Sequence, residues 1–416
     1  MVMTKLTGLR LKQGFIQAFL LFIGVVAVAG GGLLTPVQAQ DMSTDSLPDK
    51  RRALPDTAKK PFFIKKVATS AFNKYFNDTS DPEKPKFLAY PTLAFAPETS
   101  WEFGLSGLML YYARRDTTNR LSEISAFLFT TLNRQYGAWF EHFLYGHQDN
   151  WFFLGRLRFQ RFPLKYFGIG PQAQQANKQT INADYILIRE RVLRKVKPNL
   201  FVGLETDFQQ VGRIQIDPGN GVLPKPLGAE GSRNIGLGIG VVYDTRHNPL
   251  NVRKGWFGEL AYLNYNPAWG SNYKFTSLSM DGRWYKPVGS NQVWASQVFG
   301  QFMQGNVPFN QLALMGGENL MRGYYLGRFR DKTYLAAQTE YRFLPFGFSK
   351  RLGGVVFAST GAVAPTPNHF SLKHLQPAGG VGLRYLVFPK KDIFVRLDVA
   401  FTREGANFYI YTGEAF

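Results

Sequence analysis

Residues 334–343 read Tyr-Leu-Ala-Ala-Gln-Thr-Glu-Tyr-Arg-Phe, and their side chains alternate in polarity. Successive side chains of an extended strand point to opposite faces. One face of this stretch is therefore polar, with Gln338, Glu340 and Arg342, and the other is apolar. Period-two alternation of this kind predicts a strand that lies between two different environments. The same alternation recurs in three other segments: 151–160, 274–284 and 392–401.

The alternation extends over residues 87–416 and yields about sixteen strand-like segments. A soluble sandwich would alternate in the same way, so the connections decide between the two architectures. The long connections are odd-numbered in chain order and the short ones are even-numbered. Long loops at one end and short turns at the other are typical of outer-membrane barrels with both termini in the periplasm. We therefore predict an all-β fold, a transmembrane antiparallel β-barrel of about sixteen strands. The long connections are 160–181, 211–232, 304–333 and 361–379, and the short ones are 195–198, 286–291 and 389–391.

Composition agrees with a barrel and limits the possible functions. Aromatic residues make up 15% of the 416 residues, yet mean hydropathy is −0.19, which suits membrane strands better than membrane helices. The absence of cysteine excludes disulfides and thiolate metal sites. The formal charge of +20 is scattered along the chain. It favours outer-membrane lipid and lipopolysaccharide as partners over nucleic acid.

The N-terminus resembles an export signal. Basic residues precede an apolar stretch over residues 15–34, and Val37-Gln38-Ala39 suits cleavage after Ala39. We predict a secretory signal peptide over residues 1–39. An uncleaved anchor helix is the alternative.

Residues 40–86 are predicted to be a periplasmic linker. Within them, apolar residues recur at helical spacing over residues 62–76, which predicts a short amphipathic helix. This helix would cap the periplasmic mouth of the barrel or lie on the inner leaflet. A linker helix without a role is the alternative.

The connection 304–333 carries an unusual run, Met-Gly-Gly-Glu-Asn-Leu-Met-Arg-Gly-Tyr-Tyr, at residues 315–325. Gly316 and Gly317 permit backbone with positive φ, and a glycine at 323 lets the main chain approach a wall closely. Arg322 offers a planar fork of donors that matches a carboxylate. We interpret this connection as a loop folded into the barrel lumen, with its arginine bound to an acidic residue of the inner wall. An exposed loop with a solvated arginine is the alternative.

Several segments resemble one family, the BamA/TamA-type outer-membrane assembly barrels, also called the bacterial surface antigen family. The resemblance covers about residues 87–416, and the loop run matches the family's hydrophobic-Arg-Gly-aromatic motif in its sixth extracellular loop. The matching segments are Met321-Arg322-Gly323-Tyr324, Phe162–Gly170, Tyr243-Asp244-Thr245-Arg246 with Pro249 and Gly255, and the terminal Gly413-Glu414-Ala415-Phe416, which is similar to a terminal aromatic signal.

The resemblance also implies partners for the loop arginine, because in that family it pairs with acidic residues of the inner wall. Glu340 is the first candidate, by similarity and by alternation. The family's Phe-x-Asp-x-Gly motif matches residues 357–361, where Ser359 replaces the acid. The resemblance makes Ser359 a further candidate lumen partner of the loop, without the ionic contact. Asp398, which alternation places on the inner wall, is expected to compensate.

By similarity, the chain would assist the insertion or translocation of protein or lipid through a weakly paired seam between its first and last strands. Pro91 would weaken that seam by removing a backbone donor, unless the first strand begins only at Leu93. The family usually carries polypeptide-transport-associated domains, and the stretch between Ala39 and Phe87 is too short for one. Two other functions stay open: a passive pore for small solutes and a structural barrel that scaffolds an envelope complex.

Enzymatic motifs are missing from the sequence. The five histidines form no HExxH pair, and there is no GxSxG elbow or P-loop. His369 and His374 are expected to be solvated loop residues. We therefore expect no catalysis, no metal and no cofactor. A periplasmic or outer-membrane protein is a further possible partner, and we expect a monomer.

Overall fold

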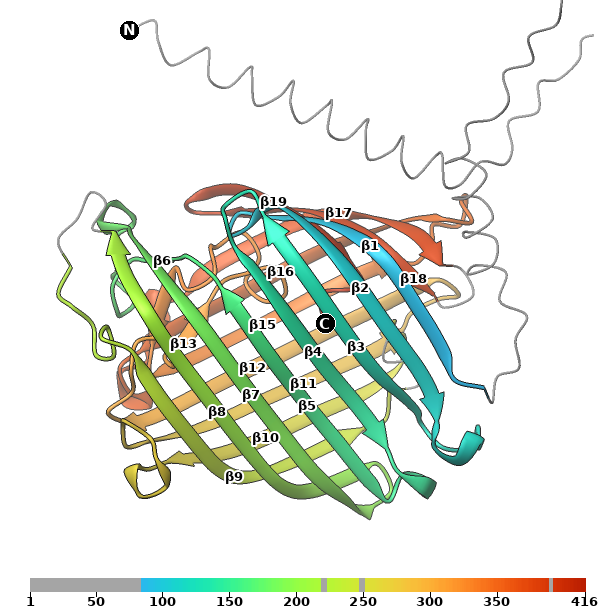
Figure 1. Ribbon diagram of the computed structural model, residues 1–416. Helices are drawn as coiled ribbons and strands as arrows, with labels where there is room; N and C mark the ends of the chain where they lie inside the picture. The colour runs from blue at the N-terminus through green and yellow to red at the C-terminus, as the bar shows by residue number, and fades with distance from the viewer. Residues whose placement is uncertain (1–83, 218–222, 247–250, 389–391) are drawn as a thin grey trace, which may run out of the picture. The chain divides into compact units, whose positions relative to one another are not determined.

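The computed structural model describes residues 84–217, 223–246, 251–388 and 392–416. The predicted signal peptide, and the linker with its amphipathic helix apart from its last three residues, lie outside the described residues. Sixteen long antiparallel strands form a closed barrel (Figure 1). These strands are β1 (Lys86–Ala96), β2 (Ser100–Tyr112), β3 (Leu121–Thr131), β4 (Tyr136–Tyr145), β5 (Trp151–Arg161), β7 (Gln179–Lys197), β8 (Leu200–Asp217), β9 (Ser232–Asp244), β10 (Gly255–Tyr265), β11 (Phe275–Pro287), β12 (Gln292–Gly305), β15 (Thr333–Phe343), β16 (Leu352–Ala364), β17 (Gln376–Phe388), β18 (Ile393–Thr402) and β19 (Gly405–Thr412).

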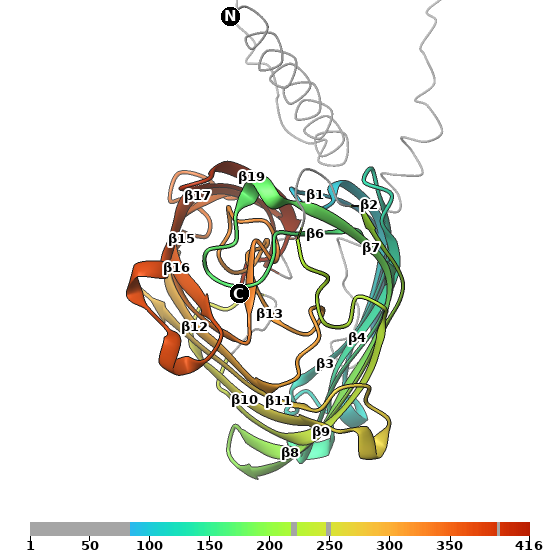
Figure 2. The same ribbon diagram turned by 90° about the vertical axis from the view of Figure 1, so that its left-hand side faces the viewer.

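Each long strand pairs with the next long strand along the chain, and β1 meets β19 to close the ring, as the end-on view of Figure 2 shows. Shorter elements lie in the connections. They are β6 (Leu164–Tyr166), which pairs with β7, the hairpin β13 (Ala313–Met315) and β14 (Phe329–Asp331), and the single 3-10 turns Ala113–Arg115, His147–Asp149, Gln175–Asn177, Pro267–Trp269, Pro367–His369 and Leu372–His374. The predicted all-β barrel of about sixteen strands is confirmed.

The alternation has the predicted directions. On β15, Gln338, Glu340 and Arg342 are buried against the lumen contents, whereas Ala337 is exposed on the outer face. Apolar side chains face outward and polar ones inward, the arrangement of a barrel in lipid. No helix in the described ranges is long and apolar enough to cross a membrane.

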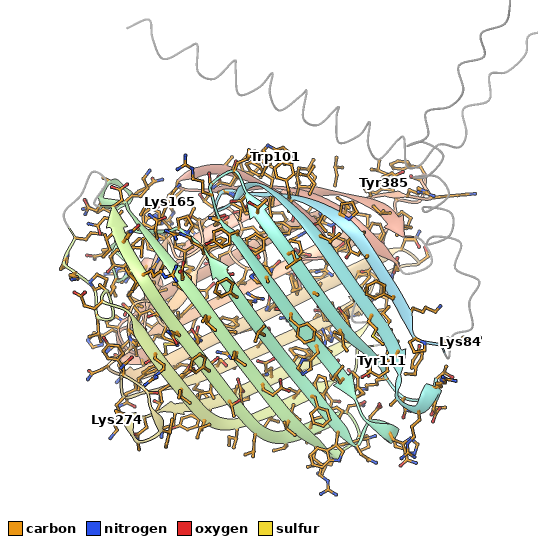
Figure 3. All side chains as sticks on the ribbon, in the orientation of Figure 1. Lys84, Trp101, Tyr111, Lys165, Lys274 and Tyr385 are labelled. Atoms are coloured by element: carbon orange, nitrogen blue, oxygen red, sulfur yellow. The ribbon has the colours of Figure 1, made fainter. Side chains whose placement is uncertain are left out.

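Long and short connections lie at opposite ends of the barrel. In Figure 3, Lys165 and Lys274 of the odd-numbered connections lie at the left end, and Lys84, Tyr111 and Tyr385 lie at the right end. Strands β7 and β8 meet through a tight turn at the second end, with Asn199 at a φ of 64°. The predicted separation of loops and turns is therefore present.

One strand differs from its prediction. Strand β19 ends at Thr412, although alternation had suggested that it continues to residue 416. Gly413 adopts a φ of 87°, a conformation that favours glycine. The chain turns there, and Ala415 and Phe416 are buried in an apolar cluster with Val252 and other residues.

Two ionisable residues break the apolar character of the outer face. His142 of β4 and Glu190 of β7 both lie opposite Gly155 of β5, on the same face as the exposed Leu157. His142 Nε2 lies 3.2 Å from Glu190 Oε1. A Cβ at Gly155 would collide with both side chains, so the glycine makes room for the pair.

We predict that this outward pair matters as a unit. His142→Leu leaves a carboxylate facing lipid without its partner and should lower the free energy of unfolding by about 1–2 kcal/mol. His142→Leu combined with Glu190→Leu should restore or exceed the stability of the unmodified protein. Urea unfolding in phospholipid vesicles, followed by tryptophan fluorescence, measures both.

The matched control is Thr206→Val, because Thr206 lies opposite Glu190 on β8 and its side chain carries no charge. It should change the unfolding midpoint little. Equal losses for the single and the double variant would show that the pair is not an energetic unit.

Candidate functional site

The connection between β12 and β15 lies inside the ring of strands (Figure 2). Its hairpin of β13 and β14 packs Met315, Met321 and Phe329 against Tyr334 of the barrel wall. The loop therefore has an apolar core of its own, shared with the inner wall. In this structure the predicted lumen loop thus packs against the inner wall.

The glycines of the loop occupy positions that other residues would strain. Gly316, Gly317 and Gly323 have φ values of 114°, 109° and 104°. A Cβ on Gly316 would lie 2.2 Å from the main-chain oxygen of Tyr325, and one on Gly323 would lie 2.5 Å from Thr402 Cγ2. The backbone at Gly323 thus touches β18 closely, as the sequence predicts.

Arg322 is fully buried between two carboxylates of the inner wall. Its Nη1 donates to Asp398 Oδ2 of β18 over 2.6 Å, and its Nη2 donates to Glu340 Oε1 of β15. None of the three side chains is exposed. The structure thus brings together the arginine and two of its predicted partners, and joins loop and wall by charge-assisted hydrogen bonds.

Three more buried arginines extend this network. Arg342 Nε donates to Glu340 over 2.7 Å. Arg384 binds Asp398 over 2.5 Å and Glu414 over 2.9 Å, while Arg396 lies 3.3 Å from Asp398. These four arginines thus bind three side-chain carboxylates, and the network is buried.

Ser359 is not a partner of the loop, which corrects the prediction for that position. Its hydroxyl is buried and has no hydrogen-bond partner in the described part of the chain. Instead, the ring of Phe357, two residues earlier on β16, lies 3.7 Å below Arg322. Arg322 thus makes a cation–π contact with Phe357, and the acid of the family motif at position 359 is absent.

The loop also contacts both sides of the junction between the first and last strands. The Gly323 amide donates to the hydroxyl of Tyr409 on β19 over 2.9 Å, and Asn407 donates to the Gly323 carbonyl over 2.7 Å. On the other side, the Leu326 amide donates to Glu98 over 2.6 Å. Glu98 lies in the turn between β1 and β2, so one loop spans the junction from within.

Tyr324, the aromatic residue of the motif, fixes the orientation of the loop. Its hydroxyl donates to the carbonyl of Pro377 on β17 over 3.1 Å, and its ring meets Phe329 edge to face. The predicted loop residue thus packs both within the loop and against the wall.

The seam between β1 and β19 is paired at one position in the described strands, Phe95 with Ile410. By contrast, β1 pairs with β2 along its whole length. The rings of Phe95 and Phe408 stack 4.0 Å apart and hold the strands together beside that pair. Strand β1 runs through Pro91, so the alternative start at Leu93 is wrong and the strand lacks one backbone donor.

The terminal segment 413–416 also differs from its expected place. The resemblance implied a terminal aromatic signal in the last strand, but the Phe416 ring packs near Tyr285 of β11, inside the barrel. Arg342 donates to the main-chain oxygen of Phe416 over 3.1 Å. Glu414 accepts from Arg384. The segment thus belongs to the network of Arg322.

A second group of charges lines the opposite wall. Arg189 binds Asp207 over 2.8 Å, and Arg191 binds Glu205 over 2.7 Å and Glu259 over 2.8 Å. Glu205 and Asp207 are buried on the inner face. Within the described residues, no group of three potential ligands could hold a metal ion.

Comparison with known proteins identifies the family. The Omp85 superfamily domain matches residues 130–387. The chain belongs to the Omp85 superfamily. Its fold is similar to that of BamA from Haemophilus ducreyi lacking POTRA domains 1–3, with 12% identity over 84% of this chain and 77% of that one and a TM-score of 0.52. It is also similar to CdiB from Acinetobacter baumannii, with 9% identity, 78% of this chain covered and a TM-score of 0.50.

This Omp85 barrel spans 59% of the CdiB chain. No curated protein sequence matches it. The family resemblance read from the sequence is thus confirmed, and the protein is an outer-membrane β-barrel. At these identities the solved structures establish the fold alone.

We predict that Arg322→Ala detaches the loop of this Omp85 barrel. Removing one partner of a buried ion pair leaves the other charges buried without a counter-ion. This should lower the free energy of unfolding by about 3–5 kcal/mol. In planar bilayers the variant should give larger and noisier single-channel currents, because the released loop no longer fills the lumen.

Arg322→Lys is the control, since it keeps the charge and loses the planar fork. Its unfolding free energy and its single-channel currents should lie between those of the unmodified protein and those of Arg322→Ala. An Arg322→Ala protein with unchanged conductance and unfolding midpoint would show that the ion pairs do not anchor the loop.

Glu98 adds a pH dependence to the contact between the loop and the β1–β2 turn. Burial, with Glu318 nearby, raises the pKa of Glu98 from 4.5 to about 7. The folded state therefore binds the proton more tightly than the unfolded state. Stabilisation is complete below pH 4.5 and is lost as pH rises through about 7, by on the order of 3 kcal/mol.

Glu98→Gln keeps the acceptor for Leu326 and removes the titration. We expect the unmodified protein to lose stability relative to this variant between pH 5 and pH 8, as measured by urea midpoints. Parallel pH profiles for the two proteins would contradict the assignment.

Proposed function

We propose that this barrel assists the insertion or translocation of protein or lipid at the outer membrane, and that cargo leaves through the seam between β1 and β19. The single observation that carries the proposal is the one residue pair, Phe95 with Ile410, across that seam. The proposal assigns no catalytic step to the chain.

The physical reason for choosing this seam is the free energy needed to separate two strands inside the membrane. Inside lipid, each backbone group of an opened strand lacks a partner, so a fully paired ladder would be costly to separate. At this seam, most of that cost is absent because the two described strands share one ladder pair. An incoming strand can pair with the edge of a sheet, which is a known mode of peptide recognition.

The lumen loop supplies the restraint that the ladder lacks. Its bonds to Tyr409 on one side and Glu98 on the other join the two edges from within. Movement of the loop would therefore release the edges together. This arrangement supports a gated seam, with the Arg322 ion pairs setting how firmly the loop is held.

The same contacts disfavour a passive pore. A loop with an apolar core occupies the interior, and charged side chains of both signs line the wall around it. A steady open channel needs a clear path through the lumen. A scaffolding role remains as the alternative if cargo transfer fails in the test below.

The arrangement in the cell is part of the proposal. The end with short turns would face the periplasm together with both termini, since outer-membrane barrels carry their long loops outside. Outer-membrane lipid and lipopolysaccharide surround the barrel, and a periplasmic or outer-membrane protein would deliver cargo. The protein would work as a monomer.

A disulfide across the seam tests the proposal. The chain has no cysteine, so Phe95→Cys with Ile410→Cys introduces the only possible bond. Proteoliposomes containing this variant receive a urea-unfolded outer-membrane barrel or a fluorescent lipid. We expect oxidation to abolish accelerated folding or lipid transfer, and reduction to restore it.

The matched control is Val298→Cys with Ala337→Cys, a directly opposed outward pair in the full ladder of β12 and β15. Oxidising this pair should leave activity unchanged. Equal activity of the seam variant in both redox states would reject the seam as the exit. A steady ohmic current with no cargo transfer would favour the passive pore.

A further inference from the structure

The turn between β15 and β16, residues 344–351, carries exposed aromatic and basic side chains. Leu352, the first residue of β16, lies opposite Tyr385, which Figure 3 shows at the end of the barrel that carries the short turns. Phe348 at the tip of the turn is 83% exposed, and Lys350 and Arg351 are exposed as well. A phenyl ring gains free energy when apolar surroundings replace water, so an apolar partner surface would stabilise this tip.

The exposed ring ends a row of aromatic side chains that begins on the barrel wall. Trp294 of β12 lies opposite Tyr341 of β15, and their ring centroids are 6.3 Å apart. The ring of Tyr341 lies 5.1 Å from that of Phe343, which lies 5.6 Å from that of Phe346. Phe346 then stacks on Phe348 at 5.1 Å. Phe348 is therefore the last member of a contiguous aromatic surface and not an isolated apolar side chain.

The first members of this row face lipid. Tyr341 is paired with Trp294 on one side and with Val356 on the other, and these two partners are 47% and 56% exposed on the outer face. Phe343 follows two residues later on the same strand and points the same way. Aromatic rings at the ends of membrane strands lie at the level of the lipid head groups. The row thus continues the lipid-facing wall into the turn at head-group depth.

Hydrogen bonds fix the turn that carries the last two rings. The Phe346 amide donates to the Leu352 carbonyl over 2.8 Å, and the Ser349 amide donates to the Phe346 carbonyl over 3.1 Å. The Ser349 hydroxyl accepts from the Leu352 amide over 2.9 Å. Leu344, at the start of the turn, is fully buried. An ordered turn therefore presents the exposed ring.

We infer that this turn anchors the barrel among the head groups of anionic phospholipid at the short-turn end. The rings of Phe346 and Phe348 would contact the first acyl methylenes, and Lys350 and Arg351 would bind lipid phosphates. Residues 344–352 contain no acid, and neither basic side chain forms an ion pair within the described residues. Basic side chains beside a membrane surface attract anionic lipid. The inference goes beyond the proposed function and does not depend on it.

A soluble protein is the other class of partner that could cover an apolar tip. The contiguity of the rings favours the membrane. A protein that covered Phe348 and Phe346 would meet lipid at Phe343, whereas lipid can cover the whole row without interruption.

A fluorescent probe beside the tip tests the inference in the whole protein. The chain has no cysteine, and a Cβ added at Gly347 would meet no atom within 4 Å. Gly347→Cys labelled with nitrobenzoxadiazole therefore reports on the surroundings of the turn. In vesicles containing phosphatidylglycerol we expect blue-shifted emission, quenching by doxyl-labelled lipid and protection from acrylamide. Adding Phe348→Ser should move the probe into water and reverse all three readings.

Lys350→Gln with Arg351→Gln tests the contribution of charge. With both basic residues present, doxyl quenching of the probe at position 347 should be stronger in phosphatidylglycerol vesicles than in phosphatidylcholine vesicles. The double variant should lose this difference.

The matched control is Pro198→Cys with the same label, because Pro198 is exposed in the β7–β8 turn and residues 195–199 contain no aromatic residue. Acrylamide should quench that probe in both lipids. Heat-dependent gel mobility checks that all variants are folded. Two results would each overturn the inference: equal acrylamide quenching at position 347 with and without Phe348, which would leave the tip to a soluble protein, or equal doxyl quenching in the two lipids.

Discussion

A strand in a membrane must find a partner for every backbone donor and acceptor, because lipid offers none. Closure of the strands into a ring meets this demand. Fifteen of the sixteen junctions between long strands have full or nearly full ladders, and the junction of β1 with β19 has a single residue pair. The protein therefore concentrates its weakness at one place. Aromatic stacking of Phe95 on Phe408 shields that place from lipid, and contacts from the lumen loop restrain it from inside.

The restraint depends on charges that are costly to bury singly. Arg322 is stable inside the barrel because two carboxylates and the ring of Phe357 surround its guanidinium. Arg342 binds the other oxygen of Glu340, and Arg384 and Arg396 bind Asp398. Each of these two carboxylates therefore binds more than one arginine, and the charges are compensated as one network.

Alternation predicted the barrel and showed which residues face inward, and connection lengths predicted the separation of long loops from short turns. The pairing of Arg322 with Glu340 and Asp398 was implied by the family resemblance together with alternation. The sequence could not predict contacts made by turns and by residues far apart along the chain. The Leu326 amide of the lumen loop donates to Glu98, although nothing near either residue indicates a partner. Ser359 is buried as expected for an inward residue, but its hydroxyl has no hydrogen-bond partner in the described part of the chain. Strand β19 seemed to continue to Phe416, since alternation cannot detect the turn at Gly413.

The turn at Gly413 connects the last strand to the ion pairs of the lumen. Because β19 ends at Thr412, its last residues are not available to extend the seam, and they enter the lumen instead. Phe416 packs beside Tyr285, and Glu414 binds Arg384, which also holds Asp398. Asp398 in turn binds Arg322 of the loop. Ion pairs through Asp398, Arg384 and Glu414 thus link the lumen loop to the segment that follows β19, and the hydrogen bond to Tyr409 links the loop to β19 itself.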